Sequence, residues 1–301
     1  MATRIPVIVN ASSGAQRSDE FSADLEARFE AVGVLTEIRL VQPEEVVAEV
    51  KRALVAKPAM IVVGGGDGSL TAAAAMLIGT DTAFGILPLG TLNHFAKDLR
   101  IPLDLDAAIK TIAGGHTQKV DVGTVNDRVF LNNSSLGLYP KAVAGREALR
   151  QRLGRDKWPA LAWAALAVLR RYPTLNVSID VDGKELARRT PFVFIGNNWY
   201  EMEGFGIGQR GRLDGAVLSL YVGNRTGRLG LLRLAMRALF RRLRQAKDFD
   251  MTSAKSIRVE TRRNPLRVAI DGERCYMRAP LHYRVVVAAL SVVVPGTPSA
   301  P

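Results

Sequence analysis

The stretch Val62-Val63-Gly64-Gly65-Gly66-Asp67-Gly68-Ser69-Leu70 decides how the N-terminal part of the chain folds. An apolar run leads into four glycines and an aspartate, and an alanine-rich segment, 70–78, follows. This order predicts a buried strand, a tight loop and a helix. Glycines after a buried strand let a ligand approach the backbone, and the amides that begin the helix favour an anion such as phosphate. The alternative is a glycine-rich turn with only a structural role.

The loop matches neither common nucleotide-binding pattern. A Rossmann loop has glycine at the sixth position of G-x-G-x-x-G, where this chain has Ser69. A P-loop requires Gly-Lys-Ser/Thr, and the loop contains no lysine. A second apolar strand, 83–89, ends in the loop Gly90-Thr91-Leu92-Asn93-His94. The function therefore depends on reading the two loops together.

As a pair, Gly64–Ser69 and Pro88–Ala96 resemble the diacylglycerol kinase catalytic domain family, bacterial lipid kinases included. The marks of that family are Gly-Gly-Asp-Gly-Thr and Pro-x-Gly-Thr-x-Asn-Asp-Phe-Ala; NAD kinases share the first mark only. The resemblance implies a lipid kinase that passes the γ-phosphoryl group of ATP, with Mg²⁺, to a lipid hydroxyl in phospholipid metabolism. The lipid itself, diacylglycerol or a related alcohol, is not identified by any motif.

The loop Asn10-Ala11-Ser12-Ser13-Gly14 follows the first predicted strand and resembles the family's Asn-Pro-x-Ser-Gly nucleotide loop. The chain departs from the family at Ala11 for proline, Ser69 for threonine, His94 for aspartate, and Arg39 near the place of a nucleotide-binding threonine. The residues that the resemblance assigns to nucleotide binding are Asn10, Ser13, Gly14, Gly64, Gly65, Gly66, Asp67, Gly68, Ser69, Gly90, Thr91 and Asn93.

The 301 residues are enough for two domains. Alternating strands and helices predict a doubly wound parallel-sheet nucleotide domain over 1–118, of the α/β class. Short strands predict an antiparallel β-sandwich over 119–294, whose last strand can return to the first domain, before a disordered tail at 295–301. The predicted helices are 19–32, 44–56, 70–78 and 105–112. The predicted strands are 5–9, 36–41, 59–63, 83–89, 119–125, 128–133, 175–183, 190–197, 216–222, 256–261, 266–270 and 284–293.

Three carboxylates are candidates for catalysis. Asp-Gly in Asp271-Gly272-Glu273 is a common two-residue hairpin turn, which is the structural alternative. The resemblance implies instead that Glu273 is the general base and that Asp271 sets the loop or the water shell of a metal. A carboxylate can lie beside nucleotide phosphates when a cation such as Mg²⁺ lies between them, and this is the hypothesis for Asp67. The alternative is that Asp67 caps the loop by accepting hydrogen bonds from neighbouring amides.

A structural Mg²⁺ site is implied at Gly211-Arg212-Leu213-Asp214-Gly215-Ala216, which resembles the family's Leu-Asp-Asp-Gly-x-Leu segment. The side chain of Asp214 and the carbonyls of Gly211 and Ala216 would be its ligands. This chain has one aspartate where many relatives have two. An ordinary Asp-Gly turn into a strand is the alternative.

The basic composition, 41 Lys and Arg against 29 Asp and Glu, gives a net charge of +12 and implies an anionic partner. Residues 228–244 form an apolar and arginine-rich helical pattern, and 158–169 is a tryptophan-containing apolar run; both predict contact with an anionic membrane surface, a solvated arginine face being the alternative. An aromatic content of 6% without a stacking platform argues against nucleic acid.

The single cysteine, Cys275, and an N-terminus without a signal-peptide pattern predict a cytoplasmic protein, peripheral to the inner face of the membrane. No apolar run reaches the roughly 18 residues of a spanning helix. Two alternatives stay open besides the lipid kinase: a non-catalytic nucleotide- and lipid-binding regulator of the same fold, and an NAD kinase. A homodimer is also left open.

Overall fold

The computed structural model describes residues 4–13, 18–137, 175–200, 202–203, 206–207, 210–223, 249–262 and 264–296. The chain divides into two compact units, each described by itself below. The first comprises Met1–Val122, Arg212–Gly215 and Val286–Pro301, and the second comprises Gly123–Gly211 and Ala216–Val285.

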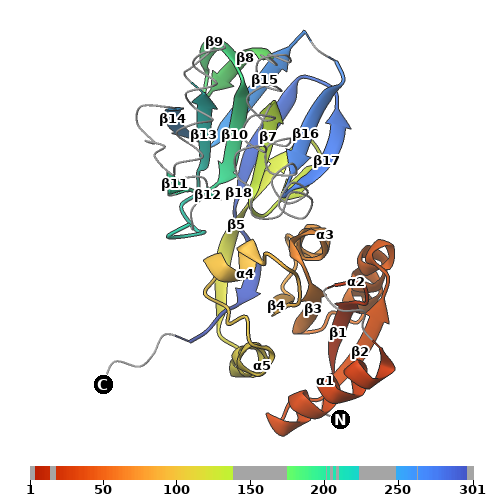
Figure 1. Ribbon diagram of the computed structural model, residues 1–301. Coiled ribbons are helices and arrows are strands. Elements are labelled where there is room, and N and C mark those ends of the chain that lie inside the picture. Colours follow the sequence, from red (N-terminus) through yellow and green to blue (C-terminus); the bar gives the residue numbers. More distant parts are fainter. Residues whose placement is uncertain are drawn as a thin grey trace, which may run out of the picture. The chain divides into compact units, whose positions relative to one another are not determined.

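A parallel sheet forms the centre of the first unit (Figure 1). Its strands follow the order β2-β1-β3-β4-β18. The central strands are continuous apolar runs and their side chains are buried, as expected for a parallel sheet that is covered on both faces. These strands are β1 (Ile5–Asn10), β2 (Thr36–Val41), β3 (Met60–Gly65), β4 (Ala83–Pro88) and the end of β18 (Leu281–Val293).

Helices pack in two layers, α1 beside α5 and α2 beside α3 (Figure 1). This arrangement confirms the predicted doubly wound α/β domain. The helices are α1 (Asp19–Ala31), the short 3-10 helix η1 (Pro43–Glu45), α2 (Val46–Val55), α3 (Asp67–Leu77), α4 (His94–Asp98) and α5 (Leu105–Gly114). Two of them differ from the prediction. Helix α3 begins at Asp67, so Asp67, Gly68 and Ser69 form its first turn, and α4 was not predicted.

Two antiparallel sheets form most of the second unit, and β11 and β12 pair as a separate two-stranded sheet. One follows the order β14-β13-β10-β7-β16-β17; the other contains β18-β15-β8-β9, and β5 and β6 form a hairpin. The strands are β5 (Thr117–Val125), β6 (Arg128–Phe130), β7 (Asn133–Gly137), β8 (Leu175–Val181), β9 (Lys184–Thr190), β10 (Phe192–Asn197), β11 (Met202–Glu203), β12 (Gly206–Ile207), β13 (Leu218–Gly223), β14 (Phe249–Ala254), β15 (Ser256–Thr261), β16 (Leu266–Ile270) and β17 (Glu273–Met277).

The core of the second unit lies between these two sheets. Val193 and Ile195 of β10 and Ile257 and Val259 of β15 are buried in one apolar cluster. The side chains between them in β15, such as Arg258, are exposed, as strand alternation requires. The predicted antiparallel β-sandwich is therefore confirmed.

Several predictions were wrong in detail or fall outside the described residues. The predicted strand 128–133 is two strands, β6 and β7, separated by a turn at Leu131 and Asn132. Strands β9, β14 and β17 were not predicted; in β9, Lys184–Thr190, the charged residues of a mostly exposed strand leave no clear apolar alternation. Gly14, the segments 158–169 and 228–244, and the tail beyond Gly296 lie outside the described residues.

Candidate functional site

Three loops meet at one edge of the parallel sheet. Strands β1, β3 and β4 are parallel neighbours that end at Asn10, Gly65 and Pro88. The predicted nucleotide-binding residues belong to these strand ends and the loops after them. Apart from Gly14, the structure therefore places them all at the edge where open α/β sheets bind ligands.

Two of these loops touch through glycine backbones. A Cβ atom added to Gly90 would collide with Gly66 Cα, and would lie 2.8 Å from Asn93 Oδ1 and 3.2 Å from the nitrogen of Gly66. Gly90 does not have a positive φ, so the lack of space, and not the backbone conformation, requires glycine. The contact holds the start of α3 against the loop after β4.

Asn93 shapes the second loop from within. Asn93 is 5% exposed and has a φ of 50°, a left-handed conformation that asparagine tolerates. Its side-chain nitrogen donates to the carbonyls of Gly90 (2.8 Å) and Pro88 (3.1 Å), and its Oδ1 accepts from the nitrogen of Gly90 (3.0 Å). Both amide donors are thus used within the loop, so Asn93 holds the loop that was predicted to bind the nucleotide.

Asp67 joins the start of α3 to the start of α4. Its Oδ2 accepts a hydrogen bond from the main-chain nitrogen of His94 (3.1 Å), and its Oδ1 accepts one from that of Phe95 (3.0 Å). Both donors are first-turn amides of α4, which have no partner within the helix. This geometry favours the loop-capping alternative for Asp67. Because a carboxylate keeps further lone pairs after two such bonds, contact with a metal or its water stays a prediction.

Asn10 joins the first loop to α3. Its side-chain nitrogen donates to Ser69 Oγ (2.8 Å), and its Oδ1 accepts from the nitrogen of Ser12 (2.9 Å). Ser13 is buried, and its amide donates to the carbonyl of Asn10 (3.1 Å). Ser69 thus supplies the hydroxyl that this junction needs, although the family has threonine at its place.

The amides at the start of α3 are open. The residue before the helix, Gly66, provides no side-chain cap, and no described residue accepts a hydrogen bond from the N–H groups of Asp67, Gly68 or Ser69. Such amides, together with the positive end of the helix dipole, are suited to a phosphate group. The backbone at the start of α3, more than any side chain, is therefore the part of this edge that is suited to an anion.

The second group of candidate residues lies in the second unit, on the hairpin of β16 and β17. Ile270 pairs with Glu273, and the two turn residues have positive φ values, 45° at Asp271 and 87° at Gly272. This is the two-residue hairpin turn that Asp-Gly favours. The carboxylate of Asp271 accepts hydrogen bonds from the nitrogens of Leu131 (2.8 Å), Asn132 (2.8 Å) and Asn133 (2.9 Å). This geometry favours a loop-setting role for Asp271.

Glu273 is the exposed first residue of β17. By strand alternation it shares a face with Cys275 and Met277, which pack against the sandwich core. Its carboxylate forms no hydrogen bond or ion pair with any residue in the part of the chain that the structure describes. It is therefore available to a substrate, and its role as a base stays a prediction.

Arg210 is a residue that the sequence did not single out. It is 3% exposed; its Nη1 donates to the carbonyls of Leu131 (2.7 Å) and Asn197 (3.0 Å), and its Nη2 donates to Asn132 Oδ1 (2.7 Å). The guanidinium also lies 5.1 Å from the ring centre of Tyr200. No local pattern marks such a residue, because its acceptors lie far away in sequence.

The predicted structural metal site has a poor ligand set. Asp214 accepts a hydrogen bond from Arg212 Nε (2.8 Å), which also raises the pKa of Arg212, and Ala216 has a φ of 55°. Among the described residues, no three His, Cys, Asp or Glu side chains are grouped to hold a metal ion. The ion pair with Arg212 competes with a metal ion for this carboxylate, although the carboxylate keeps further lone pairs. The roles of Gly211, Asp214 and Ala216 as ligands stay predictions that this geometry does not favour.

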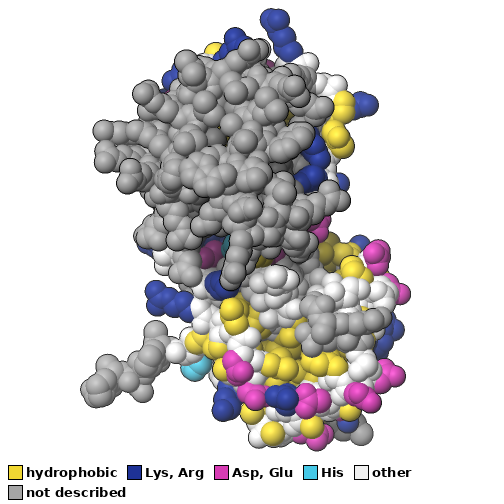
Figure 2. Space-filling view, in the orientation of Figure 1, with side chains coloured by type: hydrophobic (Ala, Val, Ile, Leu, Met, Phe, Trp, Pro, Cys, Tyr) yellow, Lys and Arg dark blue, Asp and Glu magenta, His cyan; other side chains and the backbone are white. Residues whose placement is uncertain are grey.

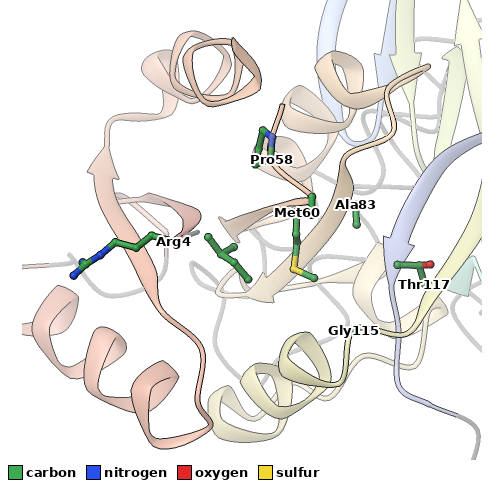
Figure 3. A pocket seen from close by; sticks show the side chains of 8 residues that line it. Arg4, Pro58, Met60, Ala83, Gly115 and Thr117 are labelled. Atoms are coloured by element: carbon green, nitrogen blue, oxygen red, sulfur yellow. The ribbon is translucent and has the colours of Figure 1, made fainter. Parts of the chain in front are cut away.

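A cavity of about 300 Å³ lies at the opposite edge of the parallel sheet. Ile5, Met60 and Ala83, which line it, begin β1, β3 and β4, and Figure 3 shows Met60 and Ala83 on neighbouring strands. This edge carries none of the predicted site residues. The cavity is therefore separate from the candidate site, which is a set of loops around a helix start.

A parallel-sheet unit with an open glycine-flanked helix start, followed by an antiparallel sandwich, defines a class of two-domain nucleotide-binding proteins. Residues 4–125 match the diacylglycerol kinase catalytic domain, and residues 140–294 match the YegS C-terminal NAD kinase β sandwich-like domain. The chain belongs to the diacylglycerol kinase family that combines these two domains. The resemblance stated from the two loops is thereby confirmed.

A sequence relative agrees with this assignment, and solved structures share the fold. A diacylglycerol kinase of Staphylococcus carnosus is 31% identical over 140 residues, which are 46% of each chain, so the match spans about half the length of that relative. A crystal structure of a diacylglycerol kinase from Bacillus anthracis is 22% identical, covers 98% of both chains and has a TM-score of 0.72. Yeast NADH kinase shares the fold at 12% identity, with a TM-score of 0.54 over 98% of this chain and 84% of its own.

Proposed function

We propose that the protein is an ATP- and Mg²⁺-dependent kinase that transfers a γ-phosphoryl group to the hydroxyl of a lipid, diacylglycerol or a related alcohol. The observation that carries this proposal is the open start of α3, held by the Gly66–Gly90 contact, where the amides of Asp67, Gly68 and Ser69 have no acceptor among the described residues. Family membership supplies the class of reaction. In this proposal the amides bind phosphate oxygens, while Asn10, Asn93 and Asp67 keep the loops in place.

Magnesium in this proposal comes with the nucleotide. Mg²⁺ typically keeps several waters and binds one or two carboxylates plus substrate phosphates, a mode that Asp67 alone can serve. The ion would neutralise the charge that develops on the transferred phosphoryl group. Asp67 would hold one of its waters with the lone pairs that the amides of α4 leave free.

Glu273 is the proposed base. As the lipid oxygen forms its bond to the γ-phosphorus, the bond from that phosphorus to the β–γ bridging oxygen breaks and ADP leaves. The proton of the lipid hydroxyl passes to the Glu273 carboxylate, which has no partner among the described residues to compete for it. A positioned carboxylate in this role contributes about 10²- to 10⁴-fold to the rate.

A basic and aromatic face supports the proposed contact with an anionic membrane. Because Cys275 and Met277 face the core, the side chains of Arg274 and Tyr276 point outward from β17, and Tyr276 is 71% exposed. Arg267 is the cross-strand partner of Tyr276. Figure 2 shows Lys and Arg side chains beside hydrophobic ones along the border of the second unit where Figure 1 places β16 and β17. None of the helices that the structure describes is long and apolar enough to cross a bilayer.

Vesicle sedimentation tests this face. Each cation near an anionic surface contributes about 1 kcal/mol, so Arg274→Glu should weaken binding to phosphatidylglycerol vesicles by roughly tenfold or more. Arg189→Glu, an exposed position on β9, is the matched control. Equal loss in both variants, or in neither, would exclude β17 as the contact. If nucleic acid displaced the protein from the vesicles, nucleic acid would instead be favoured as the anionic partner.

The activity is tested by transfer of labelled phosphate from ATP into a panel of lipids in mixed micelles with Mg²⁺. We expect a labelled lipid whose formation falls by about 10²-fold or more in Glu273→Gln. Glu260→Gln removes an exposed carboxylate that pairs with Arg258 on β15, and it should keep full activity. NADP formation from NAD would instead identify an NAD kinase. ATP binding without any phosphorylated product would identify a non-catalytic regulator.

A further inference from the structure

We propose that Arg210 is a positioning residue, which holds the hairpin turn that presents Glu273. This inference rests on the proposed function, in which Glu273 is the general base. The argument starts from the segment Leu131–Asn133, which joins β6 to β7 and lies between Arg210 and Asp271 in the hydrogen-bond network.

One side of this segment is fixed by the hairpin turn. Its three consecutive N–H groups donate to the carboxylate of Asp271, and the nitrogen of Asp271 donates back to the carbonyl of Asn133 at 2.8 Å. Four hydrogen bonds therefore tie the position of the turn, and with it the start of β17, to the position of the segment. A displacement of the segment must displace Asp271 and the neighbouring Glu273.

Arg210 fixes the oxygen atoms of the same segment. It donates to the carbonyl of Leu131 and to the side-chain oxygen of Asn132, and it also donates to the carbonyl of Asn197 at the end of β10. Asn197 reinforces this junction, because its side-chain nitrogen donates to the carbonyl of Leu131 (3.0 Å) and its main-chain nitrogen to that of Asn132 (2.9 Å). The segment is thus attached to the end of β10 both directly, through Asn197, and through the arginine.

The chemistry of the contact requires an arginine. A planar guanidinium holds several acceptors at fixed angles, whereas a lysine ammonium is a flexible point charge. A buried charge is weak evidence for stability, since an apolar side chain of similar volume often packs as well or better. The cost of burying Arg210 is therefore better explained by the geometry that its donors impose on Leu131, Asn132 and Asn197.

A double-mutant cycle tests the functional part. Arg210→Lys should lower kcat for lipid phosphorylation by about 10- to 100-fold and leave KM for ATP within about twofold, because the ATP-binding loops belong to the other unit. In a Glu273→Gln background the same substitution should cost less than about threefold, because it acts through the missing carboxylate. Full additivity of the two losses would overturn the proposal. Arg258→Lys, an exposed arginine of β15 paired with Glu260, is the control and should leave kcat unchanged.

Amide hydrogen exchange tests the positioning itself without any need for activity. Arg210→Lys should raise the exchange rate of Leu131, Asn132 and Asn133 by about tenfold or more, while the amides of β8 and β9 keep their rates. If those three rates stay at the wild-type value, Arg210 does not hold the segment and the inference fails, whatever the enzyme does. If exchange rises as expected and the wild-type protein phosphorylates no lipid, the positioning role stands and the proposed function fails.

Discussion

Replacing Gly90 by alanine tests whether the loop after β4 is in backbone contact with Gly66 in the loop after β3. The added methyl group would collide with Gly66 Cα and would lie 2.8 Å from Asn93 Oδ1. Both obstacles are parts of rigid loops, since Asn93 is anchored at both ends of its amide. The loops must therefore move apart to admit the methyl group.

The size of the effect follows from two opposing contributions. Overpacking costs about 1–3 kcal/mol, and the lower conformational entropy of alanine in the unfolded chain offsets about 0.4–1 kcal/mol. The free energy of unfolding should therefore fall by up to about 2.6 kcal/mol, which corresponds to a drop in Tm of up to about 10 °C. The shift also moves the amides at the start of α3, so the affinity for ATP should fall about tenfold or more. At an ATP concentration of 100 times the wild-type Kd, the stabilisation by ligand would fall from about 2.7 to about 1.4 kcal/mol.

Thermal unfolding with and without ATP and Mg²⁺ measures both effects in one experiment. Gly114→Ala is the matched control: Gly114 ends α5, has no positive φ, and its added Cβ would meet only His116 Cδ2 at an ordinary 3.6 Å. The control should keep the wild-type Tm, or its free energy of unfolding should rise by up to about 1 kcal/mol, because alanine is the better helix former. A Gly90→Ala protein with both the Tm and the ATP-induced shift of the wild type would refute the loop contact.

Three further changes have expected outcomes. Asp67→Asn should lower the free energy of unfolding without nucleotide by about 1–3 kcal/mol in urea titrations, because one of the two amides of α4 loses a charged acceptor; an unchanged apo stability would point to a purely ligand-linked role. Asn93→Asp places a carboxylate against two carbonyls and should lower the free energy of unfolding by about 2–4 kcal/mol. A wild-type Tm in thermal unfolding would contradict this expectation. Burial raises the pKa of Tyr283, so its neutral form stabilises the fold fully below about pH 10 and this contribution is lost as the pH rises further. Tyr283→Phe should therefore lose less stability than wild type above about pH 10, and parallel pH curves would contradict this.

The parallel-sheet unit could be predicted largely from sequence because its strands are continuous apolar runs. Thr36–Val41 was predicted to the residue, and Met60–Gly65 within two residues. The start of α3 was placed too late, since glycine, aspartate and serine disfavour helix interiors and resemble a loop. Helix α4 has five residues, and its first amides depend on a carboxylate 27 positions earlier. No local window contains that information.

In the candidate site, too, some features follow from local sequence and others depend on residues far away in the chain. Motif spacing located the loops, because glycine at a strand end is a local requirement. The partners of the polar side chains are distant in sequence: Asn10 bonds Ser69, and Asp271 bonds residues 138 to 140 positions away. Arg210 could not be found from sequence for that reason. Arg210 stands beside glycine in a segment that was interpreted as a metal loop or an Asp-Gly turn, and neither interpretation gives this arginine a role.

The structure also explains why departures from the family motifs are compatible with the loop architecture. Ala11 stands where the family has proline, and its amide donates to the carbonyl of Val41 at 2.9 Å, a hydrogen bond that proline cannot form. At His94 the bond to Asp67 uses the main-chain nitrogen, which any residue except proline supplies. What His94 changes is the charge of an exposed side chain beside the start of α3. In the proposed function this departure would change how the site handles Mg²⁺ and phosphate charge, whereas the backbone geometry that presents the amides does not depend on the side chain of residue 94.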